Sequence, residues 1–198
     1  MINENIASIL ARMRELEKQL EEELNARQEA LSYQIRDHHV RFARAVRRLH
    51  RRHKISLLRY LREARPAHIL TAPIIYSLVV PFALLDLMVV IYQQTCFRVY
   101  RIPLVRRADY VIIDRHQLAY LNAIEKLNCV YCGYGNGVIA FVREVAARTE
   151  QYWCPIKHAS RVPEPHSRFA RFLDYGDPEA WRKDLEQLRR DFDDLGAD

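Results

Sequence analysis

The sequence predicts a mainly helical, all-α protein, and three observations carry that prediction. Residues 1–65 contain neither glycine nor proline, because the first proline is Pro66 and the first of the 5 glycines is Gly133. Apolar side chains recur at intervals of three and four residues over long stretches. A long apolar segment with a single charged residue then follows, and it has the length of a membrane helix. The chain of 198 residues carries a formal charge of +6, which favours anionic partners.

Residues 1–37 predict a long amphipathic helix with the character of a short coiled coil. An apolar seam runs along residues 3–37, and its spacing shifts by a stutter after Leu20. Its members are Ile6, Ile9, Met13, Leu16, Leu20, Leu24, Leu31 and Ile35. The helix either packs on its own body or associates with a second copy, which gives a homo-oligomer, or with another protein.

Residues 38–66 predict a basic amphipathic helix next to a membrane. Its arginines outnumber a single acid, Glu63, and such a helix binds anionic lipid headgroups or follows phosphates. The candidate headgroup-binding residues are Arg41, Arg44, Arg47, Arg48, Arg51, Arg52, Arg59 and Arg62. A plain solvated face is the alternative. Nucleic acid is a less favoured partner, because no aromatic residues suited to base stacking alternate with the arginines.

Residues 67–97 predict a membrane segment in which Asp86 is the single charged residue. Three arrangements are compatible with it: one span, a re-entrant hairpin that turns at Pro81, or a buried pair of soluble helices. A carboxylate in lipid must face protein or water. Asp86 is therefore either a candidate functional residue or a residue at the membrane interface.

Residues 98–160 predict a small helical domain that carries cysteine and histidine. We expect a short strand or interfacial segment at 110–113, a helix from Asp114 to Leu127, a cysteine knuckle, and a helix from Asn136 to Trp153 that Pro155 ends. Residues 161–198 predict a linker and a charged helix that opens at Asp177–Pro178.

The candidate metal ligands of this domain are Cys129, Cys132, Cys154 and His158. Three thiolates and one imidazole can fill the tetrahedral shell of a structural zinc ion. The sequence Cys129-Val-Tyr-Cys132-Gly-Tyr resembles the first knuckle of rubredoxin-like and zinc-ribbon proteins, and Trp153-Cys154-Pro155 loosely resembles the second. The resemblance covers about ten residues and implies a bound zinc or iron ion. It departs from the family at His158, which stands in place of a fourth cysteine.

One backbone condition decides whether those ligands share an ion. An unbroken helix between the two pairs would hold them too far apart, so a shared site requires residues 133–137 to fold back. Unlinked reduced thiols with an ordinary packed histidine are the alternative.

The sequence therefore predicts a membrane-associated, zinc-binding scaffold or adaptor whose Cys/His domain is cytoplasmic. A catalytic role is less favoured, because no Ser/His/Asp order, HExxH motif or phosphate loop is present. The alternatives are a rubredoxin-like or dithiol electron-transfer partner of a membrane enzyme and a nucleic-acid binder built on the basic helix.

Overall fold

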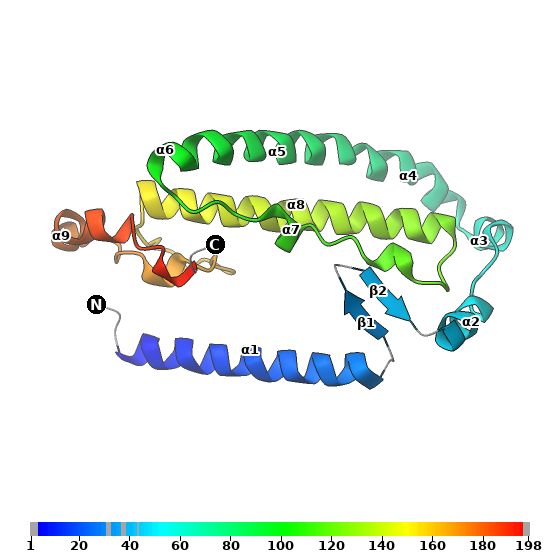
Figure 1. Cartoon of the computed structure of the whole chain (residues 1–198). Coiled ribbons are helices and arrows are strands. Elements are labelled where there is room, and N and C mark those ends of the chain that lie inside the picture. The colour runs from blue at the N-terminus through cyan, green and yellow to red at the C-terminus, as the bar shows by residue number, and fades with distance from the viewer. Residues whose placement is uncertain (1–3, 31–32, 37–38, 43, 196–198) are drawn as a thin grey trace. The chain divides into compact units, whose positions relative to one another are not determined.

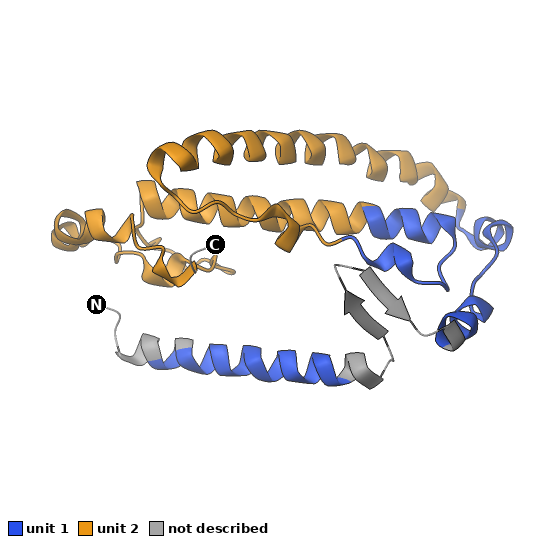
Figure 2. Ribbon diagram, viewed as in Figure 1, with its two compact units in different colours: residues 1–65, 113–130 blue, residues 66–112, 131–198 orange. Residues whose placement is uncertain are grey.

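The computed structural model describes the backbone of residues 4–30, 33–36, 39–42 and 44–195, and the side chains of residues 8–9, 11–26 and 46–195. The chain is mostly helical, which confirms the predicted fold class at that level (Figure 1). It divides into two compact units (Figure 2). Unit 1 comprises residues 1–65 and 113–130, and unit 2 comprises residues 66–112 and 131–198.

Unit 1 begins with α1 (Glu4–Ala30), which is shorter than the helix predicted to residue 37. A two-stranded antiparallel sheet follows, formed by β1 (Tyr33–Arg36) and β2 (His39–Phe42), in which Tyr33 pairs with Phe42. Tyr33, Ile35, Val40 and Phe42 alternate with polar residues, and this period of two favours strands. The expected seam position Leu31 lies outside the described residues.

The predicted basic helix over 38–66 is wrong as one continuous element. The structure has β2, then α2 (Arg44–Arg52), then α3 (Leu57–Glu63). Ser56 begins α3, since its hydroxyl accepts a hydrogen bond from the amide of Arg59 at 3.4 Å. A serine at this place favours a new helix start over helix continuation.

Helix α8 (Ala123–Trp153) replaces three predicted elements with one. The predicted helix from Asp114 is wrong, because only a short 3₁₀ turn, η2 (Arg115–Gln117), lies there. Asn122 begins α8 instead. Its carboxamide oxygen accepts from the amides of Ile124 and Glu125 at 2.9 and 3.0 Å, and the Glu125 carboxylate accepts from the Asn122 amide at 2.8 Å. This reciprocal pair is a capping box.

Unit 2 is built around an apolar helix that lies beside α8 (Figure 1). Its elements are α4 (Pro66–Ser77), α5 (Val79–Tyr92), the π turn η1 (Gln93–Phe97), α6 (Arg98–Tyr100), α7 (Arg107–Tyr110), η3 (Phe169–Arg171), α9 (Pro178–Leu188) and η4 (Asp193–Leu195). The helical path continues in one direction past Pro81, so the re-entrant hairpin at that proline is wrong. The strand expected at 110–113 is also wrong, because Tyr110 ends α7.

The apolar helix ends in a left-handed turn that sends the chain back along α8. Arg101 has φ 59° and ψ 37°, and the Ile102 amide donates to the Phe97 carbonyl at 2.9 Å. The buried side chains of Phe97 and Ile102 accompany this closure. On the returning segment, the carbonyls of Pro103 and Leu104 accept from Arg148 of α8 at 2.9 and 3.1 Å.

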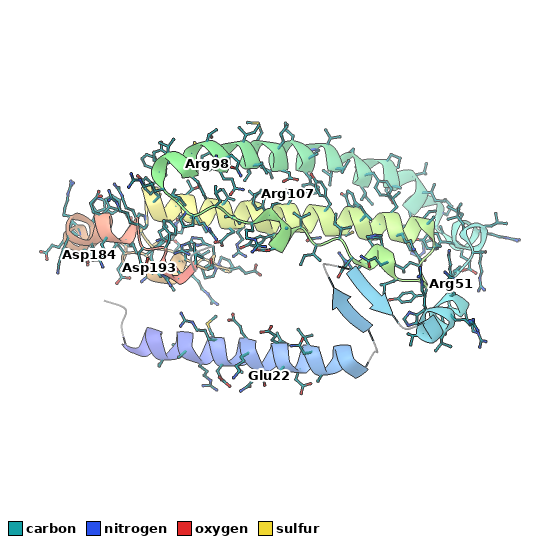
Figure 3. The ribbon with its side chains drawn as sticks, in the orientation of Figure 1. Glu22, Arg51, Arg98, Arg107, Asp184 and Asp193 are labelled. Atoms are coloured by element: carbon teal, nitrogen blue, oxygen red, sulfur yellow. The ribbon has the colours of Figure 1, made fainter. Side chains whose placement is uncertain are left out.

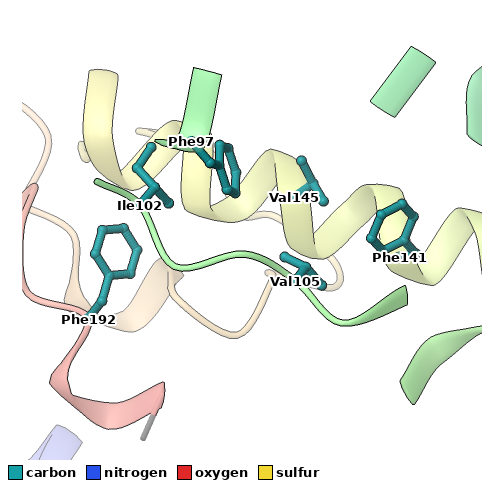
Figure 4. Packing of buried hydrophobic residues seen from close by; sticks show 6 residues of the cluster. All are labelled: Phe97, Ile102, Val105, Phe141, Val145 and Phe192. Carbon is teal, nitrogen blue, oxygen red and sulfur yellow. The ribbon is translucent and has the colours of Figure 1, made fainter. Parts of the chain in front are cut away.

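The hydrophobic core of unit 2 lies where the helix end, the returning segment, α8 and the C-terminal segment meet (Figure 4). Its buried members are Phe97, Ile102, Val105, Phe141, Val145 and Phe192. As predicted, α8 ends before Pro155, and α9 opens with Asp177 as its cap, whose carboxylate accepts from the Ala180 amide at 2.9 Å.

A buried polar cluster ties the C-terminal segment to α8. Arg168 is almost fully buried, and its guanidinium donates to Gln151, to the Asp191 carbonyl and to the Asp194 carboxylate. It also stacks over the Phe192 ring, 4.9 Å from the centroid. Gln151 in turn donates to the carbonyls of Leu188 and Asp191 at 2.9 and 2.6 Å. These bonds satisfy polar groups that burial would otherwise leave unpaired.

Candidate membrane-docking surface

The apolar helix Pro66–Tyr100 presents a long exposed face made of aliphatic side chains. Among the described residues it is the one helix that could cross a membrane by length and composition alone. Its most apolar 18-residue window has a mean hydropathy of 2.5, and only 6% of that window is buried. The exposed members include Ile69, Leu70, Ile74, Leu78, Val80, Leu84, Leu87, Met88 and Ile91. We call this set the outer face.

Two polar side chains of the helix point the other way, toward the remainder of unit 2. Asp86 and Gln93 are both buried, and they lie seven residues apart, which places them on one side of a helix. Phe82 and Phe97 continue the same side, since they stand four residues before Asp86 and four residues after Gln93. We call this stripe the inner face.

Asp86 forms an ion pair with one residue and accepts a hydrogen bond from another, and the two partners lie on separate elements. Arg107, at the start of α7, donates from Nε to Oδ1 at 2.8 Å and from Nη2 to Oδ2 at 2.7 Å. Tyr134 of α8 donates its hydroxyl to Oδ2 at 3.1 Å. The arginine side chain remains 41% exposed, whereas that of Asp86 is 11% exposed. The predicted intramembrane carboxylate therefore forms a structural ion pair within unit 2.

Gln93 makes a two-way contact with the returning segment. Its carboxamide oxygen accepts from the Val105 amide at 3.0 Å, and its nitrogen donates to the Val105 carbonyl at 3.3 Å. The residue before Gln93, Tyr92, shares a hydrogen bond of 3.0 Å between its hydroxyl and that of Thr149 on α8. These contacts leave the outer face without charged side chains.

Close packing between the apolar helix and α8 depends on a glycine. A Cβ atom on Gly135 would lie 3.0 Å from Cε2 of Phe82, so the ring packs directly on the backbone of α8. Further along, the Tyr131 hydroxyl donates to the Ile75 carbonyl at 2.7 Å, and its ring makes an edge contact with Tyr76. Gly135, predicted to belong to a turn, therefore serves a helix–helix contact instead.

Basic residues follow directly on the C-terminal end of the apolar helix. Arg98, Arg101 and Arg106 are exposed, and Arg98 and Arg107 are labelled in Figure 3. In unit 1, Arg47, Arg48, Arg51 and Arg52 are exposed on α2, as are Arg59 and Arg62 on α3. Arg59 forms an ion pair with Glu63 at 2.8 Å. Arg44 begins α2 and Arg41 lies on β2, and their side chains lie outside the described residues.

The four predicted metal ligands are not brought together. Cys129 and Cys132 both lie within α8, where residues 133–137 are helical, so the fold-back that a shared ion requires is missing. Cys132 and Cys154 are separated by about 33 Å at 1.5 Å per residue. No group of three or more His, Cys, Asp or Glu side chains that could hold a metal occurs within the described part of the chain. This donor set does not fit one tetrahedral ion.

His158 and Cys154 have other surroundings. The His158 ring stacks on Phe169, with centroids 6.2 Å apart and planes inclined by 15°. Cys154 lines an open groove of about 410 Å³ with Val89, Tyr92 and Val142. Burial and the negative charge of nearby Glu150 raise the pKa of the Cys154 thiol, so the thiolate that binds metals is disfavoured here.

The sequence analysis did not predict Arg107, Tyr134 and Gln93 as residues of this surface. The spacing of Asp86 and Gln93 could have indicated Gln93, since two polar residues seven apart in an apolar helix share a face that packs against protein. Nothing in the sequence pairs Asp86 with Arg107 in particular, because several arginines surround that position in the chain.

The fold and this surface define a mostly helical protein with one exposed apolar helix whose polar groups are satisfied internally. Comparison of the chain with protein-family models, with curated proteins and with solved structures finds no match. The function therefore has to be argued from the geometry alone.

Proposed function

We propose that this protein is a non-catalytic, membrane-associated scaffold that docks by the outer face of the helix Pro66–Tyr100. The observation that carries the proposal is the segregation on that helix: aliphatic side chains face outward, while Asp86 and Gln93 face inward and are paired. Burying a Leu, Ile or Met side chain gains about 1.5–3 kcal/mol each. A lipid surface offers such burial without any polar partner.

The geometry favours a helix that lies in the membrane interface over a helix that crosses the bilayer. The helix has 35 residues, which is about 52 Å at 1.5 Å per residue, against about 30 Å of hydrocarbon. Residues 101–106 return along α8 without regular secondary structure. Lipid-exposed irregular backbone does not occur in the hydrocarbon region. Docking by one face keeps that segment in water.

The positive charges near the apolar helix favour one class of lipid headgroup. Arg62 and Arg65 precede the apolar helix, Arg98 lies in its last turn, and Arg101 follows it. The chain carries a formal charge of +6. Basic residues beside an interfacial helix strengthen binding to anionic lipids. We therefore propose anionic headgroups as the lipid partner, with the exposed arginines of α2 and α3 as further contacts.

The experiment is flotation of the full chain with vesicles of neutral phosphatidylcholine or of phosphatidylcholine mixed with phosphatidylserine. We expect binding that is stronger to the anionic vesicles and that persists in part at 1 M salt. The variant Leu84→Asp/Met88→Asp changes two outer-face residues and is expected to lose binding. Tyr175→Asp is a control for the added charge, because Tyr175 is an exposed aromatic residue of unit 2 that lies outside the outer face.

Two results would overturn the proposal. One is complete release of the protein by salt, which would leave electrostatic adsorption without apolar insertion. The other is unchanged binding by the double variant when its circular dichroism shows the fold to be intact.

A further inference from the structure

We propose that α1 forms a parallel two-stranded coiled coil with α1 of a second copy of this chain. The proposal rests on three features of the described residues: an exposed apolar stripe, the phase of its spacing, and the charges beside it. It is independent of membrane docking, because α1 shares no residue with the outer face.

The described part of the apolar stripe of α1 is left exposed. Every described side chain of the helix is exposed, and Ile9, Met13, Leu16, Leu20 and Leu24 are between 51% and 60% exposed. Side chains project from the helix on all sides, as Figure 3 shows around Glu22. Most of the stability of a helix in water comes from burying its apolar face. A 27-residue helix with this stripe is therefore expected to pair.

The spacing of the stripe matches a coiled-coil seam. Ile9, Met13, Leu16 and Leu20 follow in steps of four, three and four, so they occupy alternating d and a positions of a heptad. Leu24 follows after four further residues, which is a stutter that locally unwinds the supercoil without breaking the seam.

The flanking charges complement those of an identical helix in parallel register. In this phase Arg12 is a g residue and Glu17 is the e residue of the next heptad. In a parallel dimer a g residue faces the e residue of the next heptad on the partner helix, so Arg12 of each copy meets Glu17 of the other. Neither residue forms an ion pair within the described part of the chain, whereas Lys18 and Glu22 pair on the outer side at 3.9 Å.

Charge also argues against lipid as the occupant of this stripe. Residues 4–30 contain seven acidic and four basic residues, so anionic headgroups would repel the helix. A second copy offers the same apolar stripe, and its Arg12 and Glu17 meet the opposite charge across the seam.

The test is a charge swap on the full chain in detergent micelles, with the dimer dissociation constant measured by analytical ultracentrifugation. We expect Arg12→Glu or Glu17→Arg to weaken the dimer about tenfold, because each places two like-charged pairs across the seam. The double swap Arg12→Glu/Glu17→Arg restores opposite charges and is expected to return the dissociation constant to within about twofold of the wild type.

The matched controls are Arg14→Glu and Glu21→Arg, which make the same chemical changes at b positions away from the seam. They are expected to leave the dissociation constant within about twofold. Leu16→Asp places a charge in the seam and is expected to give a monomer. A wild-type chain that stays monomeric at all concentrations overturns the proposal, and so does a dimer that the double swap fails to rescue. Vesicle binding is measured separately, so failure here is distinguishable from failure of the proposed function.

Discussion

Arg107 holds the Asp86 carboxylate with two nitrogens at 2.8 and 2.7 Å, and the two residues lie on elements that the chain reversal at Arg101 brings together. The fork-shaped guanidinium matches the two carboxylate oxygens. This pair fixes the returning segment to the apolar helix and removes the charge from the outer face.

We predict that Arg107→Ala destabilises the protein by about 1–3 kcal/mol, because it leaves a mostly buried carboxylate without its counter-ion. Replacing both partners, as in Asp86→Leu/Arg107→Leu, should recover part of that loss, since no unpaired charge then remains. Urea unfolding in detergent, followed by circular dichroism, measures the unfolding free energy of the single and the double variant. An equal loss of unfolding free energy in the two variants would contradict this account.

The glycines of α8 provide a matched pair of substitutions. A Cβ on Gly137 would lie 2.7 Å from Cα of Val111 and 2.8 Å from the Tyr110 carbonyl oxygen, so backbone must move. On Gly135 it would meet the Phe82 ring at 3.0 Å, where a side chain can give way. We expect Gly137→Ala to destabilise by about 1–3 kcal/mol.

For Gly135→Ala we expect a much smaller change in unfolding free energy, because alanine gains up to about 1 kcal/mol in a helix interior. Thermal unfolding compares the two variants. If Gly135→Ala destabilises as strongly as Gly137→Ala, then the Phe82 contact is more rigid than this argument assumes.

Asp194 gives the fold a defined dependence on pH. Burial by itself raises the pKa of this carboxyl, but the hydrogen bond and charge of Arg168 and the charge of Arg171 outweigh it and lower the pKa below the ordinary value of 3.8. The native state therefore binds fewer protons than the unfolded state. The stabilisation is fully present above the unfolded pKa and is lost as pH falls through the lower folded pKa.

We expect Asp194→Asn to be less stable than the wild type at pH 7, with a gap that narrows progressively below about pH 4. The gap is the difference in unfolding free energy between the wild type and the variant, and it is measured from pH 7 to pH 3. A gap that stays constant to pH 3 would show that Asp194 contributes through packing and not through its charge.

Interfacial docking and membrane crossing differ in where the two ends of the apolar helix lie. We replace the four native cysteines with serine and place one cysteine at Arg65 or at Arg101, which flank the helix and are both exposed. In sealed vesicles with the protein added from outside, a membrane-impermeant maleimide should label both positions. Labelling of only one position would favour a spanning helix.

The separation of the predicted ligands leads to a prediction about metal removal. Because Cys132 and Cys154 lie about 33 Å apart along α8, a strong zinc chelator should leave the unfolding midpoint unchanged. The chelator should likewise leave the unfolding midpoint of the Cys154→Ser variant unchanged. A chelator-dependent loss of stability in the wild type that Cys154→Ser abolishes would revive the shared zinc site.

The sequence could predict the elements whose signals are local. The absence of glycine and proline predicted α1, Asp177 and Pro178 predicted α9, and a run of aliphatic residues predicted the apolar helix. The continuity of α8 could not be read in the same way. Three glycines within five residues favour a turn by propensity. The packing of Gly135 against Phe82 and of Gly137 against Val111 overrides that preference.

The candidate surface could be predicted only in part. Composition identified the apolar segment and Asp86 as the one charged residue within it. Its partners Arg107 and Tyr134 stand 21 and 48 residues away in the chain, and such pairings follow from the tertiary path of the backbone. The cysteine spacing misled because CxxC is compatible with a helix as well as with a metal-binding turn.

The π turn Gln93–Phe97 has a consequence for the rotational phase of the apolar helix. An α-helix advances 100° per residue, and a π turn accommodates one additional residue without breaking the helix. If the same residues wound as a regular α-helix, the additional residue would rotate everything after it by about 100°. That rotation would turn Phe97 out of the core and misdirect the chain reversal at Arg101. One wide turn therefore keeps the outer face and the inner face of this helix in step along its length.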